Sequence, residues 1–282
     1  MTSSWMVVAA FLFATMAVFV KLGSQYFGAA ELAFYRSLVT MVVAFICLSA
    51  TRGTVRTGYL AMHAIRGLVG ALAIICYFYS ISSLSLATAQ TLYYTSPLFI
   101  AIATTVVLRE RPSRWLVAAV ALGFVGVALL LQPHFDEGKE VAVLAGVLGG
   151  MLAAWAYLSV RTLGRLGEPD WRVVFWYGAF ATVFCAVWQG VTSSFHPVTR
   201  DNWWMLLGLG VCGALAQWAV TRAYRTGNTL VVGALLYSSI VFAALFTYVL
   251  WNDRLGALEW AGIAVIIASG ILAMRAGKRM TK

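Results

Sequence analysis

The amino-acid sequence predicts an all-α integral membrane protein with ten transmembrane helices in two inverted five-helix repeats. Of its 282 residues, 62% are hydrophobic and 11% charged, whereas a soluble domain has roughly 45 to 50% and about 25%. The hydrophobic residues form ten long continuous runs, and the sequence repeats itself weakly at an offset of half its length. This composition excludes a soluble cytosolic enzyme.

The ten runs are interpreted as helices because each has about the length that a bilayer needs, and none shows the alternation of a membrane β-barrel. No basic leader precedes the first run and nine others follow, so we expect a retained helix there and not a cleaved signal. The predicted spans are residues 6–20, 30–48, 64–82, 86–108, 114–131, 141–162, 171–191, 203–222, 230–250 and 258–274.

Lysine and arginine orient the spans. The loops after even-numbered spans and the C-terminal tail hold 14 of these residues: Arg52, Arg56, Arg109, Arg111, Arg114, Arg161, Arg165, Arg172, Arg222, Arg225, Arg275, Lys278, Arg279 and Lys282. The opposite loops hold four: Lys21, Lys139, Arg200 and Arg254. The positive-inside rule therefore predicts that both termini are cytoplasmic. Most of the basic residues behind the net charge of +10 lie in these loops and the tail, where they orient the chain, so we expect no nucleic-acid partner.

A shift of 143 residues aligns the two halves of the chain. It places Gly67 and Gly70 on Gly210 and Gly213, and without a gap it also pairs Tyr94 with Tyr237. One register across two spans favours duplication over a shared apolar composition. We therefore expect a single domain over residues 1–282, with repeats at about residues 4–134 and 140–277.

An odd number of spans in each repeat inverts the second copy in the membrane. Inverted repeats are typical of secondary transporters, whose two halves exchange conformations around a site near the midplane. The sequence thus favours transport by alternating access. An intramembrane enzyme or a non-transporting receptor or scaffold is the alternative, but HExxH, GxSxG and paired buried carboxylates are all missing from the sequence.

Several segments carry a family resemblance. The spans include FYR, RGLVG and SPLF, beginning at Phe34, Arg66 and Ser96. With these the chain resembles EamA-type members of the drug/metabolite transporter superfamily, in particular the branch of S-adenosylmethionine uptake carriers and organic-anion exporters. The resemblance implies a multi-pass inner-membrane carrier for an amino-acid-like, S-adenosylmethionine-like or organic-anion metabolite. It implies no cofactor or metal, and a homodimer is compatible with it.

Arg36 lies inside the second predicted span, where a charge is costly and is a functional hypothesis by default. Its guanidinium could hold a carboxylate or phosphate of the substrate in a forked pair. Alternatively, it is a structural clamp that pairs with Glu31 or a lipid phosphate, or reaches the surface. Arg66, at the start of the third span, is expected to be an interfacial anchor.

Pro97 marks a predicted break near the middle of the fourth span. Proline lacks a backbone donor and frees the carbonyl of Tyr93, so this helix offers either a hinge or a tolerated kink capped by Ser96. Ile240 takes the place of the proline in the ninth span, so we expect the hinge not to be duplicated.

Polar and aromatic residues at depth within the spans complete the predicted substrate site. Gln90 and Tyr94 share one face of the fourth span and Tyr93 flanks it, while Tyr237 and Ser238 occupy the matching stretch of the ninth span. Trp155, Gln217 and Trp218 are expected to face protein or cavity. The resemblance implies a cavity lined by spans one, three, four, six, eight and nine, although aromatic packing remains an alternative for both tryptophans.

All ten acidic residues lie in loops or near helix ends, so no carboxylate is expected at the midplane. Proton-coupled carriers commonly use such a carboxylate. Exchange or facilitated movement is therefore favoured, and a sodium site built from amides or backbone stays open. The four cysteines lie within apolar runs and predict free thiols.

Overall fold

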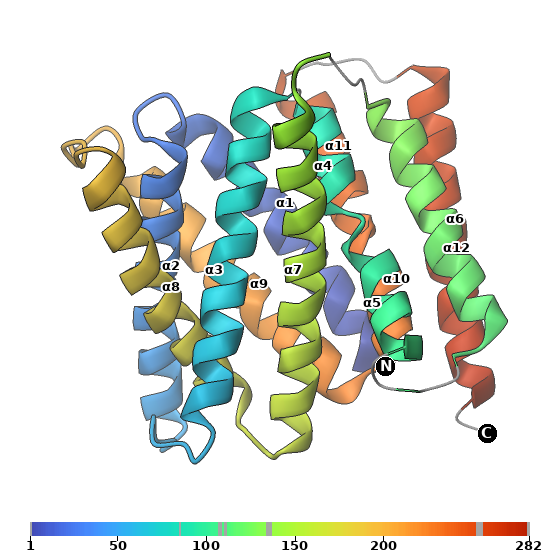
Figure 1. The fold of residues 1–282 in the computed structure, drawn as a ribbon, viewed down its shortest axis with the longest axis horizontal. Coiled ribbons are helices and arrows are strands. Elements are labelled where there is room, and N and C mark those ends of the chain that lie inside the picture. Colours follow the sequence, from blue (N-terminus) through green and yellow to red (C-terminus); the bar gives the residue numbers. More distant parts are fainter. Residues whose placement is uncertain are drawn as a thin grey trace.

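The computed structural model describes residues 2–84, 86–106, 109, 112–133, 137–251 and 256–280, which form a bundle of long helices (Figure 1). After a short 3-10 turn, Thr2–Ser4, the described residues form these helices: α1 (Trp5–Gly23), α2 (Ala29–Ala50), α3 (Leu60–Ser83), α4 (Leu86–Tyr93), α5 (Ser96–Val106), α6 (Arg114–Leu131), α7 (Glu140–Arg165), α8 (Asp170–Thr192), α9 (Trp203–Thr226), α10 (Thr229–Leu236), α11 (Ser238–Trp251) and α12 (Ala257–Met280).

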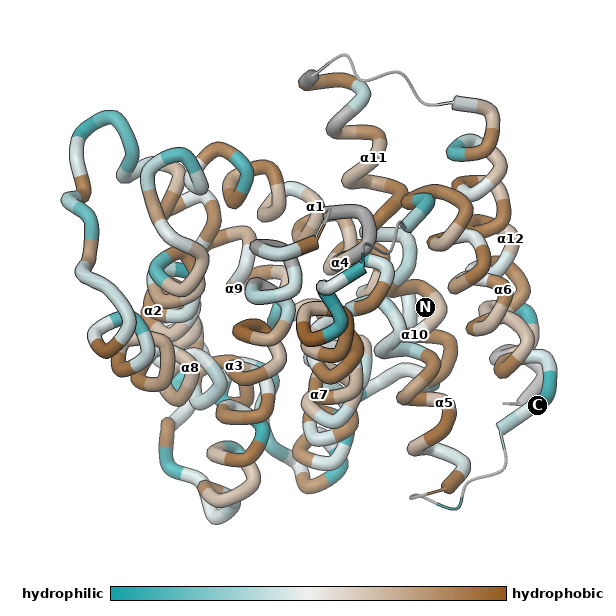
Figure 2. Tube along the Cα trace, turned by 45° about the horizontal axis from the view of Figure 1, so that its top comes forward, coloured by the Kyte–Doolittle hydropathy of each residue, from teal (hydrophilic) through white to brown (hydrophobic). Residues whose placement is uncertain are grey.

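The helices agree with the apolar runs of the sequence. Nine helical segments in the described part of the chain are long and apolar enough to span a membrane. The predicted fourth span corresponds to α4 and α5, which are individually short, and the ninth corresponds to α10 and α11. Figure 2 shows mostly hydrophobic helices, with hydrophilic stretches gathered in the connecting loops. The chain is therefore an all-helical, multi-pass membrane protein.

The fourth span is broken where Pro97 predicts it. Helix α4 ends at Tyr93 and α5 begins at Ser96. The Thr95 hydroxyl donates to the carbonyl of Leu92 at 2.5 Å. The Ser96 hydroxyl is buried without a partner, so Ser96 does not supply the cap that the kink alternative requires, and the Thr95 hydroxyl bonds the turn.

The ninth span is also divided, at the single residue Tyr237, whose backbone keeps helical angles (φ −60°, ψ −21°). That the hinge is not duplicated stays a prediction. The Ser238 hydroxyl donates to the Leu235 carbonyl at 2.6 Å, and the Ser239 hydroxyl donates to the Leu236 carbonyl at 2.8 Å. Serine hydroxyls that bond backbone carbonyls in this way loosen a helix without proline. The two breaks therefore arise from different chemistry at matching positions.

The two breaks face each other. The Tyr94 hydroxyl lies 2.6 Å from the Ser239 hydroxyl. A Cβ atom on Gly233 of α10 would lie 3.6 Å from Cβ of Pro97, so the two broken spans pack closely here. The interrupted backbones thus meet inside the protein, where irregular structure is tolerated within a membrane.

Helix neighbours form a regular pattern. Helix α2 packs on α8 and α6 on α12, while α1 packs on α9 and α3 on α7. Exchange of the first six helices with the last six reproduces these four pairings. The α6–α12 contact depends on glycine, because a Cβ atom on Gly262 would lie 2.6 Å from the backbone nitrogen of Leu130. Small residues allow such close approach of membrane helices.

The largest buried apolar cluster lies where α1, α7, α9 and α10 meet, and it includes Met6, Val160, Val220 and Leu235. The start of α1 and the end of α12 lie toward the same end of the bundle, the lower end in Figure 1. We call this the terminal end and the other the distal end.

Candidate substrate cavity

A cavity of about 370 Å³ lies inside the bundle. Ligand pockets commonly have volumes of this order. Residues from the helices α1, α2, α3, α4, α7, α8, α9, α10 and α11 line it. Spans one, three, four, six, eight and nine thus contribute as the family resemblance implies, and the second and seventh spans contribute as well.

Arg36 reaches this cavity from α2 and is 7% exposed. Its terminal nitrogen donates to the Tyr177 hydroxyl at 3.1 Å, and its Nε lies 3.3 Å from the sulfur of Met16. A Cβ atom on Gly213 would come within 3.2 Å of the Arg36 side chain, so glycine leaves room for it. The guanidinium therefore lies deep in the bundle and does not reach the surface.

Glu31, which the clamp hypothesis pairs with Arg36, has another partner. Its carboxylate accepts hydrogen bonds from the His196 backbone nitrogen at 2.8 Å and is 2.7 Å from the His196 imidazole. This contact fastens the loop after α8 to the start of α2. The proposed pair between Glu31 and Arg36 is absent from these described residues.

Arg66 is a second cavity arginine, and the expectation of an interfacial anchor is wrong. Helix α3 begins at Leu60 and not at residue 64, which places Arg66 farther inside the bundle at 2% exposure. Its guanidinium lies 4.2 Å from the centre of the Tyr177 ring. A desolvated cation–π contact of this kind is worth about 2 kcal/mol. Tyr177 thus holds both arginines, one by its hydroxyl and one by its ring.

Aromatic side chains form much of the remaining wall. Tyr77, Tyr93, Tyr94 and Tyr157 line the cavity. The rings of Tyr77 and Tyr93 have centroids 4.5 Å apart. No acidic residue is among the described residues that line the cavity, while Lys21, Arg36 and Arg66 are. The site is therefore cationic and aromatic.

Five of the predicted site residues line the cavity: Arg36, Gln90, Tyr93, Tyr94 and Gln217. Gln217 is 4% exposed, and its amide nitrogen has no hydrogen-bond partner. Ser239 contributes to the lining where Ser238 was predicted. The structure brings these side chains together from both halves of the chain.

Four predicted site residues lie elsewhere. Trp155 is 53% exposed on the outside of α7, so the expectation that it faces protein or cavity is wrong. Trp218 packs between Trp5 and Trp171, with ring centroids 5.0 and 5.5 Å away, as the packing alternative predicts. Tyr237 is fully buried against α6, where a Cβ atom on Gly123 would collide with its ring. Ser238 bonds the Leu235 carbonyl of α10 and is not among the residues that line the cavity.

The terminal end of the cavity is closed. The stacked rings of Tyr157 and Tyr224 are 5.2 Å apart. Beyond them the carboxylate of Asp170 pairs with Arg225 at 2.9 Å and Arg222 at 3.3 Å, joining the start of α8 to the end of α9. At the distal end, in contrast, the lining includes the exposed Lys21 and Ser24 at the end of α1. The cavity therefore extends to the surface at the distal end.

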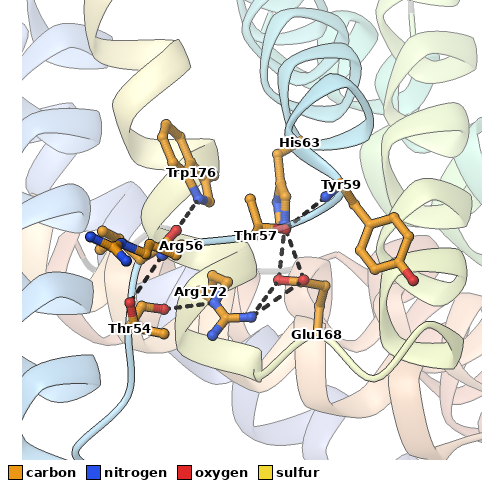
Figure 3. Close-up of polar contacts among 9 residues, drawn as sticks. Thr54, Arg56, Thr57, Tyr59, His63, Glu168, Arg172 and Trp176 are labelled. Carbon is orange, nitrogen blue, oxygen red and sulfur yellow. Dashed lines mark hydrogen bonds and ion pairs between the residues drawn. The ribbon is translucent and has the colours of Figure 1, made fainter.

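A separate polar cluster at the terminal end joins the loop between α2 and α3 to the start of α8 (Figure 3), and within it the buried Nδ1 of His63 has no hydrogen-bond partner. The Glu168 carboxylate accepts from Thr57 at 2.8 Å and from Arg172 at 3.3 Å, and lies 3.2 Å from the His63 imidazole. The indole of Trp176 donates to the Val55 carbonyl at 3.0 Å. These contacts fasten the loop between α2 and α3 to α8. Because Trp176 directly precedes Tyr177 in α8, they help to hold Tyr177 in position beside the two arginines.

The four cysteines are free, as predicted. Among the described residues, no group of three or more His, Cys, Asp or Glu side chains could hold a metal ion. The side chains that line the central cavity offer guanidinium, amide, hydroxyl and aromatic groups.

These features define a polytopic membrane protein with a central ligand cavity. The EamA-like transporter family matches residues 1–132 and 141–275, and the chain belongs to this family, within the drug/metabolite transporter superfamily. It is thus a membrane transporter, as the FYR, RGLVG and SPLF segments suggest.

Curated relatives cover almost the whole chain. The pseudopaline exporter of Pseudomonas aeruginosa is 30% identical over 277 residues, which are 96% of this chain and 95% of the relative. A riboflavin transporter of Vibrio cholerae is 24% identical over 94% of this chain and 90% of its own. Human solute carrier family 35 member G1 is 25% identical over 93% of this chain and 76% of its own.

A solved crystal structure of another protein has the same fold. It matches with a TM-score of 0.86 at 18% sequence identity, covering 99% of both chains. At this identity the likeness concerns the fold alone, and it supports the helix arrangement described above.

Proposed function

We propose that this protein is a secondary transporter for a small metabolite that carries a carboxylate. The observation that carries this proposal is the pair of buried arginines, Arg36 and Arg66, in a cavity whose described lining includes no acid. Burial of two cations without counter-ions is costly, so an anionic ligand that supplies the missing negative charge is stabilised in the cavity. A forked guanidinium–carboxylate pair is the geometry that suits arginine best.

The tyrosines select the rest of the ligand. Tyr77, Tyr93, Tyr94 and Tyr157 offer ring faces that pack a planar or apolar group and attract a cationic one. An amino-acid-like substrate or an organic anion therefore fits both parts of the cavity. An S-adenosylmethionine-like cation would rely on the tyrosine rings alone for its positive centre.

We further propose ten membrane crossings in two inverted repeats. The interrupted pairs α4–α5 and α10–α11 each form one crossing, which gives each half five. The exchange pattern of the helix contacts supports this arrangement. The family match to residues 1–132 and 141–275 also supports it, since these ranges agree closely with the proposed repeats.

The two ends of the cavity support transport by alternating access. The cavity extends to the surface at the distal end, while the Tyr157–Tyr224 stack and the Asp170 ion pairs lie at the terminal end, as expected for a state open on one side. Rocking of one half against the other would exchange the open and closed ends. Because arginine and lysine concentrate at the terminal end, we place that end in the cytoplasm and the protein in the inner membrane, so this state faces outward.

Uptake into proteoliposomes tests the proposal. Radiolabelled amino acids, dicarboxylates and S-adenosylmethionine are offered to vesicles with and without purified protein. We expect saturable uptake of a carboxylate compound and competition by other carboxylates. Amide or ester derivatives of the same compounds serve as controls, and we expect them to compete weakly. Saturable uptake of cations alone would overturn the anion assignment, and the absence of any saturable flux would overturn transport.

A further inference from the structure

The two cavity arginines are arranged around one tyrosine. The guanidinium carbons of Arg36 and Arg66 lie 6.0 and 4.2 Å from the centre of the Tyr177 ring. Arg36 approaches the hydroxyl of this tyrosine at 3.1 Å, whereas Arg66 lies over the ring face. The two carbons are therefore separated by at most about 10 Å, the sum of their distances from the ring centre. One small ligand can contact both guanidinium groups.

Each arginine has its own space beside a glycine. A Cβ atom on Gly70 of α3 would lie 2.9 Å from a terminal nitrogen of Arg66, and one on Gly213 of α9 would lie 3.2 Å from Cγ and Nε of Arg36. The 143-residue shift pairs Gly70 with Gly213. Matching glycines in the two halves of the chain thus leave room for one guanidinium each. The cavity therefore has two cationic positions on different helices.

The protein itself satisfies these guanidinium groups poorly. A guanidinium has five N–H donors and a full positive charge. The side-chain contacts of Arg36 are the Tyr177 hydroxyl and the Met16 sulfur, both uncharged. The Nε atom of Arg66 is buried without a hydrogen-bond partner. None of the described residues that line the cavity is acidic, so both arginines keep charge and donors for a ligand.

Two buried cations require two negative charges. A single carboxylate could form a forked pair with one arginine, but the other would stay a buried cation without a counter-ion, which is strongly unfavourable. Two carboxylates on one molecule would give each arginine a charge-assisted pair. A phosphate monoester also carries two charges, but it concentrates them on one centre. The two glycine-lined positions favour two separate anionic groups.

We propose that the substrate carries two carboxylates, one bound by Arg36 and the other by Arg66. The part of the molecule between or beside the carboxylates packs against the tyrosine rings of the same cavity, among them Tyr77 and Tyr93. This inference rests on the proposed transport of a carboxylate and narrows the substrate to dicarboxylates. Monocarboxylates would leave one arginine unpaired and bind more weakly.

Matched ligand pairs test the two-carboxylate substrate on the unmodified protein. Succinate is compared with succinamate, and glutarate with glutaramate, at equal ionic strength and at a pH where all carboxyl groups are ionised. The measurement is thermal unfolding of the detergent-purified protein, because a ligand that binds only the folded state raises the unfolding temperature. We expect at least one dicarboxylate to bind roughly 10- to 150-fold more tightly than its half-amide, the range for one charged hydrogen bond.

The other outcomes separate this inference from the proposed function. Equal affinities within every pair, together with saturable uptake of carboxylates, would overturn the two-carboxylate substrate and leave carboxylate transport standing. Absence of both stabilisation and uptake would overturn the two together. Tighter binding of glycerol phosphate than of any dicarboxylate would assign both arginines to one dianionic centre and so overturn the inference as well.

Variants assign the two carboxylates to the two arginines. Arg66→Gln and Arg36→Gln should each bind a dicarboxylate and its half-amide about equally, since one cation is left. Gly70→Ala keeps both charges but displaces the Arg66 guanidinium, and it should also reduce the preference for the dicarboxylate. The matched control is Arg56→Gln, an exposed arginine in the loop between α2 and α3, which should keep the full preference. Loss of the preference in Arg56→Gln, or its full retention in Arg66→Gln, overturns the inference.

Discussion

Arg36 is expected to govern substrate binding more than folding. Its guanidinium lies in the cavity and contacts Tyr177 and Met16, neither of which carries a compensating charge. Arg36→Ala should therefore cost one charged hydrogen bond to the ligand, about 1.5 to 3 kcal/mol, or roughly 10- to 150-fold in affinity. The measurement is ligand-induced thermal stabilisation of the purified variant, compared at equal folded yield.

Arg36→Lys is the informative control, since it keeps the charge and removes the forked geometry. An intermediate loss is expected. If Arg36→Ala instead prevents recovery of folded protein while Arg36→Lys restores it, the structural clamp explains Arg36 better than substrate contact does.

Tyr177 positions the two arginines from α8. Tyr177→Phe keeps the ring under Arg66 and removes only the hydroxyl that accepts from Arg36. We expect an increase of roughly 5- to 10-fold in the KM of transport, equivalent to about 1 kcal/mol for one hydrogen bond, with little change in unfolding temperature. An unchanged KM together with a lower unfolding temperature would show that the hydroxyl serves only stability.

The sequence predicts cavity residues well when their side chains are strongly polar and therefore costly to bury in a membrane. It predicts them poorly when the side chains are amphipathic. Arg36 and Gln217 stand out because a buried charge or amide needs a reason within a membrane. The prediction for Trp155 is wrong because an indole is amphipathic and is also stable on an outer helix face. Arg66 was missed because helix α3 begins four residues earlier than the apolar run indicates.

At the scale of elements, Pro97 is expected to set the rate of conformational exchange. Its missing donor leaves α4 and α5 separate at Tyr94 and Thr95. Pro97→Ala supplies a donor that favours a continuous helix. Exchange measured in counterflow should slow roughly tenfold, which corresponds to about 1.4 kcal/mol in the barrier. Equilibrium ligand affinity should change less, and an equal effect on both quantities would contradict the hinge.

Gly150 of α7 is expected to be essential for the broken span. A Cβ atom there would lie 2.6 Å from the Thr95 hydroxyl oxygen and 2.9 Å from the Tyr93 carbonyl oxygen. Gly150→Ala should lower the free energy of unfolding by about 1 to 3 kcal/mol through overpacking. Gly190→Ala is the control, since nothing lies within 4 Å of a Cβ atom on that helical glycine. It should be neutral or slightly stabilising, and equal losses in both variants would contradict the packing argument.

The second break shows why element-scale prediction is incomplete. Proline predicts a break, because it has no backbone N–H and so interrupts the hydrogen bonds of a helix. Tyr237, Ser238 and Ser239 carry no such prohibition, and serine is common in intact helices. The interruption at Tyr237 depends on side-chain bonds to Leu235 and Leu236 and on the facing Tyr94, which become visible only in three dimensions.

For the whole molecule, the apolar runs were sufficient to predict the order of the long helices along the described part of the chain. The closure at the terminal end was not predictable. It joins Asp170 to Arg222 and Arg225 across more than fifty residues, and each of these side chains alone is an ordinary loop charge. Which end of a transporter is closed differs between its conformations. One sequence encodes all of these conformations, so it does not indicate which end is closed.

The proposed inversion of the two repeats makes a prediction about matching loops. Arg56 and Thr199 are related by the 143-residue shift, and they lie in the exposed loops after α2 and α8. In a background without native cysteines, Arg56→Cys should react with an impermeant thiol reagent only from the cytoplasm, and Thr199→Cys only from outside, because five crossings reverse the second repeat. The measurement is labelling in intact cells and in inverted vesicles, with Arg161→Cys as a further cytoplasmic position. Labelling of Arg56→Cys and Thr199→Cys from one compartment would disprove the inversion, and with it the exchange of open ends on which alternating access depends.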